Sequence, residues 1–314
     1  MLNKTGHILR KEEPAGKKSM KKSMKDKSIA EVRGFPKKSQ GILHLVGTPI
    51  GNLEDITLRG LRILREADLI ACEDTRQTQK LLNHYQIDTR TTSYHEHNEM
   101  TKAPELVLTL EEGARIALVS DGGMPGISDP GYRLVHLCIR HNIPVVPVPG
   151  ASALIAGLVA SGLPTHSFRF SGFLPSKSNA RCKTLEKFKD FEGTTIVFES
   201  PHRIVEALKD VQKVMGNRPT VVAREVSKIH EEFLRGRCSE VLENLQTRPS
   251  IQGEITLLIG QTEDEAPTIL ASRPLKERME QLMSEKKLNR MDALKTVARE
   301  RHISKSQAYR EFQS

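Results

Sequence analysis

The sequence of 314 residues contains no tryptophan, and only 4% of its residues are aromatic. Proteins that bind single-stranded nucleic acid without sequence preference stack the bases on aromatic side chains. The composition therefore argues against a stacking surface of that kind. The sequence also lacks any run of 18 apolar residues, and so predicts no transmembrane helix.

Cysteine is scarce as well. Cys72, Cys138, Cys182 and Cys238 lie far apart, and none belongs to a CxxC pair. This spacing indicates neither a disulfide framework nor a zinc site, and it fits a reducing cytoplasm. The first residues lack the apolar segment of a secretory signal, which agrees with a cytoplasmic location.

Several motifs that identify common ligand sites are missing. There is no GxxxxGK followed by Ser or Thr, and no GxGxxG after the first predicted strand, so nucleotide and dinucleotide sites are unsupported. Neither HExxH nor GxSxG occurs. His95 and His97 flank a single Glu, a pattern that favours hydrogen bonding or a surface role over metal binding. The sequence therefore predicts no metal site.

The net charge of +9 is concentrated at one end. Residues 1–40 contain twelve Lys or Arg and four Asp or Glu, which leaves about +1 for the rest of the chain. We predict that residues 1–40 form a disordered basic extension. The extension either attracts phosphate nonspecifically or is solvated and has no role, and we expect its removal to leave activity nearly intact.

From residue 41 onward, short β-forming runs alternate with amphipathic stretches. The predicted strands cover 42–46, 69–72, 92–95, 116–120, 144–148, 168–173, 195–198, 220–223, 231–235 and 254–259. The predicted helices between them cover 57–67, 75–84, 103–112, 129–140, 152–161, 178–189, 200–215 and 239–246. Two of these helix starts are assigned from capping residues, Asp129-Pro130 and Ser200-Pro201.

This alternation predicts an α/β fold with a parallel sheet built by right-handed crossovers. We expect an α/β domain at 41–162 and a second one at 163–262, with antiparallel pairing toward the end of the second. Residues 263–314 are predicted to form a linker and a helix-turn-helix-like tail with helices at 275–286, 290–301 and 304–312. Ser304 and Gln307 fit a capping box. The tail either binds nucleic acid or is a packing or dimerisation bundle.

The central feature is RIALVSDGGMPGISDPG, residues 115–131. A buried strand ends at Asp121, four glycines or prolines follow within five residues, and a helix is expected next. Such a loop lets backbone approach a ligand closely. In an open α/β sheet this junction is where ligands bind, whereas a tight turn with glycines for packing alone is the alternative.

Polar, glycine-bearing segments recur at the ends of the predicted strands. They are GTPIGN, EDTR, HEHNE, SDGGMPG, PGASA, ESPHR, REVSK and QGEI. Most stand at carboxyl ends, which in a parallel sheet share one rim, so we expect them to converge on one crevice. Spacing alone indicates a two-domain enzyme with a neutral pocket lined by backbone.

The same motifs, in this order, resemble the tetrapyrrole methylase (class III) family of S-adenosylmethionine-dependent methyltransferases. GTPIGNLEDITLRG, VSDGGMPGISDPG, ESPHR and VVAREVSKIHEE carry the resemblance, which covers about 41–312. Within this family, the motifs most resemble bacterial members that methylate a cytidine 2′-oxygen in the decoding region of 16S ribosomal RNA. One departure is Met124, where the family usually has Thr, so a hydrogen bond from a hydroxyl there is in doubt.

The resemblance implies S-adenosylmethionine in a cleft between the two domains, and a homodimer. The residues that it implies at the cofactor are Asp121, Gly123, Ile127, Ser152, Ala153, Phe198, Ala223 and Ile255. Those expected on the substrate side are Thr48, Pro49, Asn52, Arg76, His95 and Arg203.

A ribose hydroxyl is a poor nucleophile, so a base or a cation that stabilises the alkoxide should assist the transfer. The catalytic candidates on the rim are Asp74, Glu199, Arg224 and Lys228. The arginines on the rim suit phosphate clamps equally well, and an interdomain salt bridge is the alternative for every charged candidate.

The expected partner is the small ribosomal subunit with its 16S RNA, and no membrane. Because the body is nearly neutral, its basic footprint must be local, with candidates at Lys177, Arg181, Lys183, Lys187 and Lys189 and in the tail. Two other functions stay open: methylation of a small tetrapyrrole, or a noncatalytic ribosome-binding factor of the same fold.

Overall fold

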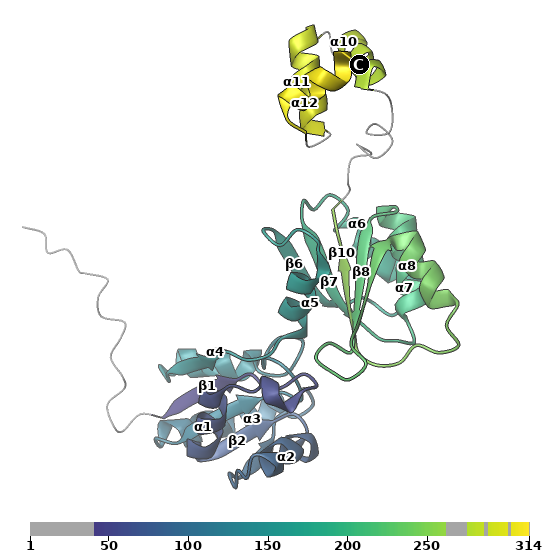
Figure 1. Ribbon diagram of the computed structural model, residues 1–314. Coiled ribbons are helices and arrows are strands. Elements are labelled where there is room, and N and C mark those ends of the chain that lie inside the picture. Colours follow the sequence, from purple (N-terminus) through teal and green to yellow (C-terminus); the bar gives the residue numbers. More distant parts are fainter. Residues whose placement is uncertain (1–40, 262–274, 286–287, 301–302, 314) are drawn as a thin grey trace, which may run out of the picture. The chain divides into compact units, whose positions relative to one another are not determined.

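The computed structural model describes residues 41–261, 275–285, 288–300 and 303–313. The predicted basic extension at 1–40 and most of the predicted linker lie outside these residues. The described residues form two β-sheets, each with its own helices, and three further helices near the C-terminus. Figure 1 labels these elements.

The first sheet has five parallel strands in the order β3-β2-β4-β1-β5. They are β1 (Ile42–Val46), β2 (Leu69–Cys72), β3 (Thr91–Ser93), β4 (Arg115–Val119) and β5 (Val145–Val148). The connecting helices are α1 (Leu58–Glu66), α2 (Thr75–His84), α3 (Glu99–Glu111) and α4 (Tyr132–Arg140), and the short 3-10 helix η1 is Leu53–Asp55. The predicted parallel sheet is confirmed.

Two apolar clusters hold helices to opposite faces of this sheet. One joins Val46 and Ile70 to leucines of α1 and α2, and the other joins Leu43 and Ile116 to residues of α3 and α4. Successive strand residues point to opposite faces, so a buried parallel strand is apolar on both. This explains the continuous apolar runs in the sequence.

The second sheet is mixed and has the order β6-β7-β10-β8-β9. Its strands are β6 (Phe168–Phe173), β7 (Thr194–Glu199), β8 (Pro219–Arg224), β9 (Glu232–Arg237) and β10 (Ile255–Ile259). β6 and β7 are parallel, whereas β10 runs antiparallel to both β7 and β8. The expected antiparallel pairing is confirmed, and the boundaries of the two domains stay predictions.

The two faces of the second sheet are covered by helices from different parts of the chain. Helices α6 (Ser178–Glu186), α7 (Ile204–Met215) and α8 (Cys238–Gln246) share one apolar cluster with the sheet. On the other face lies α5 (Ala153–Ser161), whose Leu158 packs with Ile196, Val221 and Leu258. Because α5 follows β5 of the first sheet directly, this contact ties the first sheet's chain to the second sheet.

Two predicted helix starts are wrong. α4 begins at Tyr132 with Gly131 as its N-cap, so Asp129 does not cap it. α7 begins at Ile204 with Arg203 as its N-cap, and Ser200-Pro201 forms a turn before it. In both cases the residue expected to cap makes contacts outside the helix. α3 also starts four residues earlier than predicted, because Asn98 organises the preceding turn by accepting from the His95 amide at 2.9 Å.

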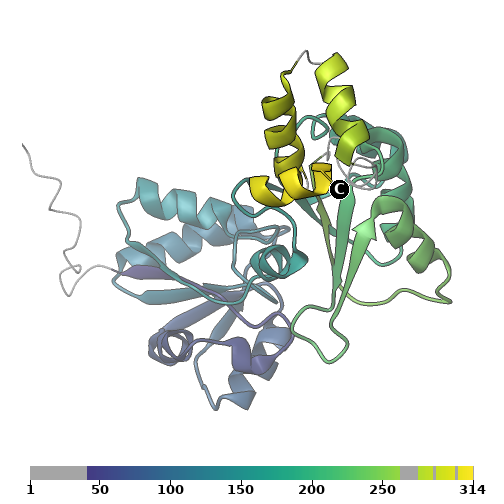
Figure 2. The ribbon, with the colours of Figure 1, turned by 45° about the horizontal axis from the view of Figure 1, so that its top comes forward.

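The C-terminal helices α10 (Leu275–Glu285), α11 (Arg290–Glu300) and α12 (Lys305–Gln313) form a bundle with its own apolar core (Figure 2). Leu282, Ala293 and Val297 lie in that core. The predicted capping box is confirmed, since the Ser304 amide donates to Gln307 Oε1 at 3.1 Å and the Gln307 amide donates to Ser304 Oγ at 3.2 Å. Among the helices that the structure describes, none is long and apolar enough to cross a membrane.

Candidate functional site

A cavity of about 680 Å³ lies where the loops of the first sheet meet the second sheet. Its volume falls in the range of small-molecule and cofactor sites, about 300–1,000 Å³. One wall comes from the loops after β1, β4 and β5, and the other from β7, β8 and β10 and the loops beside them. The expected convergence of strand ends on one crevice is observed for six of the eight segments, whereas no residue of EDTR or HEHNE lines the cavity.

The loop after β4 is fixed to the loop after β1 by backbone pairing. Thr48 and Gly123 exchange two amide hydrogen bonds of 2.9 and 3.0 Å, and Thr48 Oγ1 donates to the Ser120 carbonyl at 3.0 Å. Gly123 adopts φ +89°, a conformation that favours glycine. The pairing holds the backbone of 120–123 against the cavity without an intervening side chain.

The backbones of the loops after β1 and β5 also approach each other closely. A Cβ atom on Gly47 would lie 2.7 Å from the Gly150 Cα and 2.7 Å from Met124 Sδ. A Cβ on Gly150 would lie 2.8 Å from the Gly47 backbone. Only glycine fits at this crossing. Met124, the departure from the family pattern, lies against Gly47 and lines the cavity.

The opposite wall is a row of neighbours in adjacent strands. Thr256 of β10 pairs with Phe198 of β7 on one side and with Ala223 of β8 on the other. The Phe198 ring packs edge-on against Phe170, with ring centroids 4.9 Å apart. The sheet thus presents a rigid, largely apolar surface to the cavity.

Two charged groups stand in this wall. Glu199 has a fully buried side chain, accepts from the Ser200 amide at 2.8 Å and lies 3.2 Å from Arg203 Nε. Lys228 Nζ lies 2.8 Å from Glu225 and 3.3 Å from Glu254. Burial lowers the pKa of Lys228, but hydrogen bonds and charge from these two glutamates outweigh it and raise the pKa. Lys228 is therefore a cation at neutral pH.

Carboxylates gather on the first-sheet side. Asp121 and Asp129 line the cavity, and Asp121 Oδ1 accepts from the Asp74 amide at 3.1 Å. Burial and the neighbouring charge of Glu73 raise the pKa of Asp129 to about 6, against a weaker opposing hydrogen bond to Ser120. Burial and Asp121 raise the pKa of Glu73 as well. This side of the cavity is thus suited to a cationic group.

The cavity brings together most of the residues singled out from the sequence. All eight residues predicted at the cofactor line it: Asp121, Gly123, Ile127, Ser152, Ala153, Phe198, Ala223 and Ile255. Thr48 and Pro49 from the substrate set also line it, as do Glu199 and Lys228 from the catalytic set.

Six predicted site residues are not among those that line the cavity, and each has another contact. Asn52 caps η1 and accepts from the Glu54 amide at 3.1 Å. Asp74 and Arg76 pair with each other at 2.8 Å, which with the backbone amide of Arg76 lowers the pKa of Asp74 to about 2. The ring of His95 lies half-buried beside His97.

The other two are arginines of the second sheet's part of the chain, Arg203 at the N-cap of α7 and Arg224 at the end of β8. Arg203 Nη2 donates to the Leu174 carbonyl at 2.6 Å, besides its pairing with Glu199. Arg224 Nε donates to Glu232 at 3.0 Å. Arg203 and Arg224 each form an ion pair, but both pairs lie within the second half of the chain, so neither is the predicted interdomain salt bridge.

Sequence reasoning missed several cavity residues. Asp129 was assigned to a helix cap, and Phe173 to the end of a strand. Gln77 and Lys80 lie on the face of α2 that lines the cavity, and no motif marks them. Of these four residues, Asp129 alone stands in a motif, SDPG, that could have pointed to the site.

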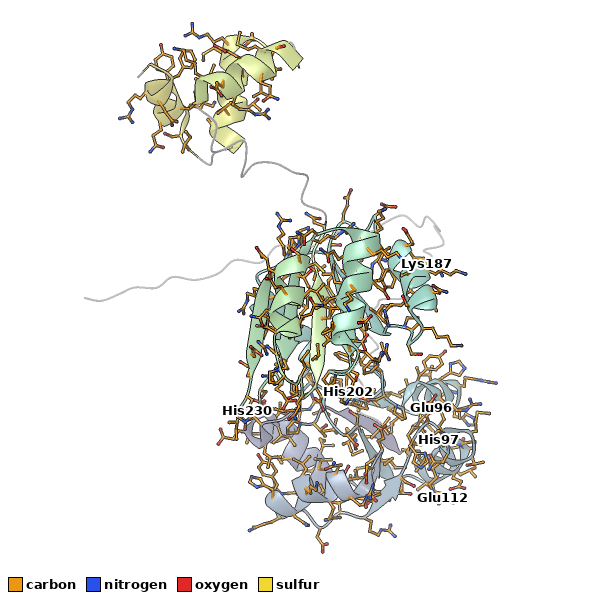
Figure 3. All side chains as sticks on the ribbon, turned by 90° about the vertical axis from the view of Figure 1, so that its right-hand side faces the viewer. Glu96, His97, Glu112, Lys187, His202 and His230 are labelled. Atoms are coloured by element: carbon orange, nitrogen blue, oxygen red, sulfur yellow. The ribbon has the colours of Figure 1, made fainter. Side chains whose placement is uncertain are left out.

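In the part of the chain that the structure describes, no three His, Cys, Asp or Glu side chains are placed to hold a metal ion. All four cysteines are free, and three of them are buried. Figure 3 shows the side chains on the ribbon and labels His202 and His230, which belong to loops of the second sheet.

Comparison with known proteins gives a consistent result. The sequence model of the family described as Tetrapyrrole (Corrin/Porphyrin) Methylases matches residues 42–242. A protein of Halalkalibacterium halodurans named Ribosomal RNA small subunit methyltransferase I is 52% identical over 220 residues, 70% of this chain and 76% of the relative. One of Bacillus subtilis with the same name is 40% identical over 277 residues, 87% of this chain and 94% of the relative.

Solved structures show the same fold. The native uroporphyrin III C-methyl transferase of Thermus thermophilus has a TM-score of 0.50 and 22% identity, covering 70% of this chain and 97% of that one. A cobalt precorrin-4 methyltransferase has a TM-score of 0.50 and 18% identity, covering 70% and 94%.

Proposed function

Because this chain belongs to the tetrapyrrole (corrin/porphyrin) methylase family, we propose that it transfers a methyl group from S-adenosylmethionine to RNA of the small ribosomal subunit. The observation that carries this proposal is the match to relatives named Ribosomal RNA small subunit methyltransferase I, which extends over 94% of one of them. The finer proposal is 2′-O-methylation of a cytidine ribose in the decoding region of 16S RNA.

The cavity fits the proposed cofactor. Gly122, Gly123, Ala153 and Ala223 leave backbone and small side chains to contact adenine, ribose and the methionine portion. The carboxylates of Asp121 and Asp129 complement the positive charge of a sulfonium. When bound, S-adenosylmethionine supplies a methyl group that is already activated.

The chain's own residues must then position the acceptor and handle its proton. Positioning alone can supply much of the acceleration when donor and acceptor are held in line. We propose that Thr48 and Pro49 contact the acceptor ribose at the mouth. Of the four catalytic candidates, only Glu199 and Lys228 line the cavity.

We assign different roles to these two. Lys228 is held charged by Glu225 and Glu254, so it can stabilise an alkoxide but cannot accept the proton. Both oxygens of Glu199 lie near the Arg203 guanidinium, and Oε1 also accepts from the Ser200 amide, so its side chain is fixed by these contacts. We propose that Glu199 orients the turn 200–203 at the substrate side.

Exposed lysines of α6 and the residues beside it are the proposed contacts to RNA phosphates. Lys177, Lys183, Lys187 and Lys189 are exposed, and Figure 3 labels Lys187. Arg181, predicted with them, is instead buried against Asp210 and is removed from this set. Contacts of this kind weaken with salt. They suit a shaped ribosomal particle better than tight binding of free RNA.

We also propose a homodimer. Helices α4 and α5 each expose large apolar side chains: Tyr132 and Ile139 on α4, and Ile155 and Val159 on α5. Such exposed apolar surface marks interaction sites on proteins. A Val159→Glu variant should shift the mass measured by light scattering from dimer to monomer. A monomeric wild-type protein would contradict the proposal.

The free cysteines support a cytoplasmic location.

The experiment that tests the function is methyl incorporation from labelled S-adenosylmethionine into small subunits from cells that lack this protein. Naked rRNA is assayed alongside, and nucleoside mass spectrometry identifies the product. A single 2′-O-methylcytidine on the particle is the expected result. No incorporation despite cofactor binding would contradict it and favour a small tetrapyrrole substrate or a noncatalytic factor.

A further inference from the structure

A second, open groove of about 480 Å³ lies beside the cavity. Its walls are the turn after β7, the end of α8 and the loop between α8 and β10. None of the individual residues assigned to the cofactor, the substrate or catalysis lines this groove, although Pro201, His202 and Gln252 belong to the predicted segments ESPHR and QGEI.

The groove is continuous with the cavity on two sides. Pro201 lines both, with Ser200 before it in the cavity and His202 after it in the groove. On the other side Gln252 lines the groove, and Gly253 and Glu254, which follow it, line the cavity. Pro201 and the consecutive residues 252–254 therefore join the edge of the groove to the edge of the cavity.

The lining has the chemistry of a site for a nucleotide base. Val205, Leu245 and Ile251 supply an apolar floor. The side chains of His202, Gln246 and Gln252 are exposed and can donate or accept hydrogen bonds at its edge. RNA-binding proteins recognise unpaired bases by this combination of apolar contact and hydrogen bonds to base edges.

The electrostatics of the groove suit a phosphodiester. No Asp or Glu is among its ten lining residues, in contrast to the cavity with Asp121 and Asp129. Arg248 lines the groove and donates to Glu232 at 2.8 and 2.6 Å. Glu232 also accepts from Arg224, whose Nη1 donates to the Gln252 carbonyl at 3.2 Å. Arg224 and Arg248 thus share the carboxylate of Glu232 beside the groove.

We infer that this groove binds the RNA nucleotide adjacent to the one that is methylated. The inference rests on the proposed function, since it requires a polymeric RNA substrate. Only one ribose needs to enter the cavity, and the strand must leave it along a surface that accepts a base and a phosphate. The groove is such a surface and starts where the cavity ends.

The test compares two double variants. His202→Ala/Gln252→Ala removes exposed groove side chains, and the Gln252 carbonyl that accepts from Arg224 is retained. His166→Ala/Gln79→Ala is the matched control, because both of its residues are exposed and line neither cavity nor groove. We expect KM for the small subunit to rise about tenfold in the groove variant, because this is the effect of losing one or two hydrogen bonds. The Kd of the groove variant for S-adenosylmethionine should equal that of the wild type. The control variant should keep the wild-type values of both KM and Kd.

Ultraviolet crosslinking gives a readout that is independent of turnover. Subunits carrying 4-thiouridine in their RNA are irradiated with the wild-type protein, and crosslinked peptides are identified by mass spectrometry. Crosslinks at 201–205 or 245–252 are expected, and their absence would overturn the inference. An unchanged KM in the groove variant would also overturn it.

The two proposals fail in different ways. If the wild-type protein methylates nothing but crosslinks to RNA at these peptides, the groove binds RNA but the proposed reaction is wrong, and with it the assignment of the bound nucleotide as the neighbour of a methylated one. If methylation is normal, the groove variant has an unchanged KM and no crosslink maps to the groove peptides, the proposed function is supported and the groove inference is wrong.

Discussion

Arg181 of α6 and Asp210 of α7 form a buried ion pair in which Arg181 Nε donates to Asp210 Oδ2 at 2.7 Å. Only 4% and 11% of the two side chains are exposed. Ser178 Oγ donates to the other oxygen of Asp210 at 3.0 Å. The pair thus joins two helices that cover the same face of the second sheet.

Asp210→Ala should lower the free energy of unfolding by about 3 kcal/mol or more, because it leaves a buried guanidinium without its partner. Urea unfolding followed by circular dichroism measures this. Arg181→Met/Asp210→Leu should recover most of the loss, since replacing both charges avoids their desolvation. Glu206→Ala, which breaks an exposed pair on the same helix, is the control. Equal losses for Asp210→Ala and Glu206→Ala would contradict the prediction.

Gly150→Ala should destabilise the protein by about 1–3 kcal/mol, the cost of overpacking. The new Cβ would lie 2.8 Å from backbone atoms of Gly47, whose amide donates to the Val148 carbonyl at 3.1 Å, so this backbone cannot move cheaply. Gly157→Ala on α5 is the matched control, because its Cβ would meet Thr256 Cγ2 at an ordinary 3.4 Å. Thermal unfolding of both variants decides the question, and a stable Gly150→Ala protein would refute the close crossing.

Asp129→Asn should raise stability at pH 8 and lower cofactor affinity. The pKa of Asp129 is raised to about 6, above its ordinary value of 3.8, so the unfolded state loses this proton first. The stability of the wild type therefore falls as pH rises from about 4 to about 6, and stays lower above that range. The asparagine does not titrate and escapes this loss.

Melting temperatures at pH 5 and pH 8, with calorimetric Kd values for S-adenosylmethionine, check the Asp129 prediction. The melting-temperature advantage of the variant should be larger at pH 8 than at pH 5. A variant less stable than the wild type at pH 8 would show that the carboxylate is stabilised where it lies.

Lys228→Met should lower kcat by about 10²–10³-fold, the usual loss when one donor to a developing oxyanion is removed. Its effect on the Kd for S-adenosylmethionine should be small, because the proposed role of Lys228 concerns the acceptor oxygen. Single-turnover methylation of small subunits measures the rate. The exposed Lys213→Met on α7 serves as control. A change in KM alone would move Lys228 from catalysis to substrate binding.

Much of the fold is predictable because its signals are local. The strand that ends at Val119 is apparent from its apolar run of residues, and the loop after it is apparent from its content of glycine and proline. The capping box at Ser304 is likewise a property of four consecutive residues. The convergence of loops on one cavity follows from parallel topology, which the alternation of elements indicates.

The errors have a common physical cause. Asp129 has the residue type and position of a helix cap, but its carboxyl group contacts Ser120 and lies near Glu73, contacts made across the fold. Arg224 follows a strand end like the other predicted site residues, yet Glu232 on the neighbouring strand holds it. Which charged side chains face the cavity and which pair with one another depends on long-range contacts that residue type does not encode.

The position of β10 has a consequence for how the protein is made. This strand lies between β7 and β8, although it comes after every other strand that the structure describes. During synthesis the first sheet has all its strands once β5 has emerged, and N-terminal domains can fold at that point. The second sheet must wait for residues 255–259, and Ile255 and Thr256 complete a wall of the cavity. A nascent chain stalled before β10 would therefore have a folded first half and no binding site.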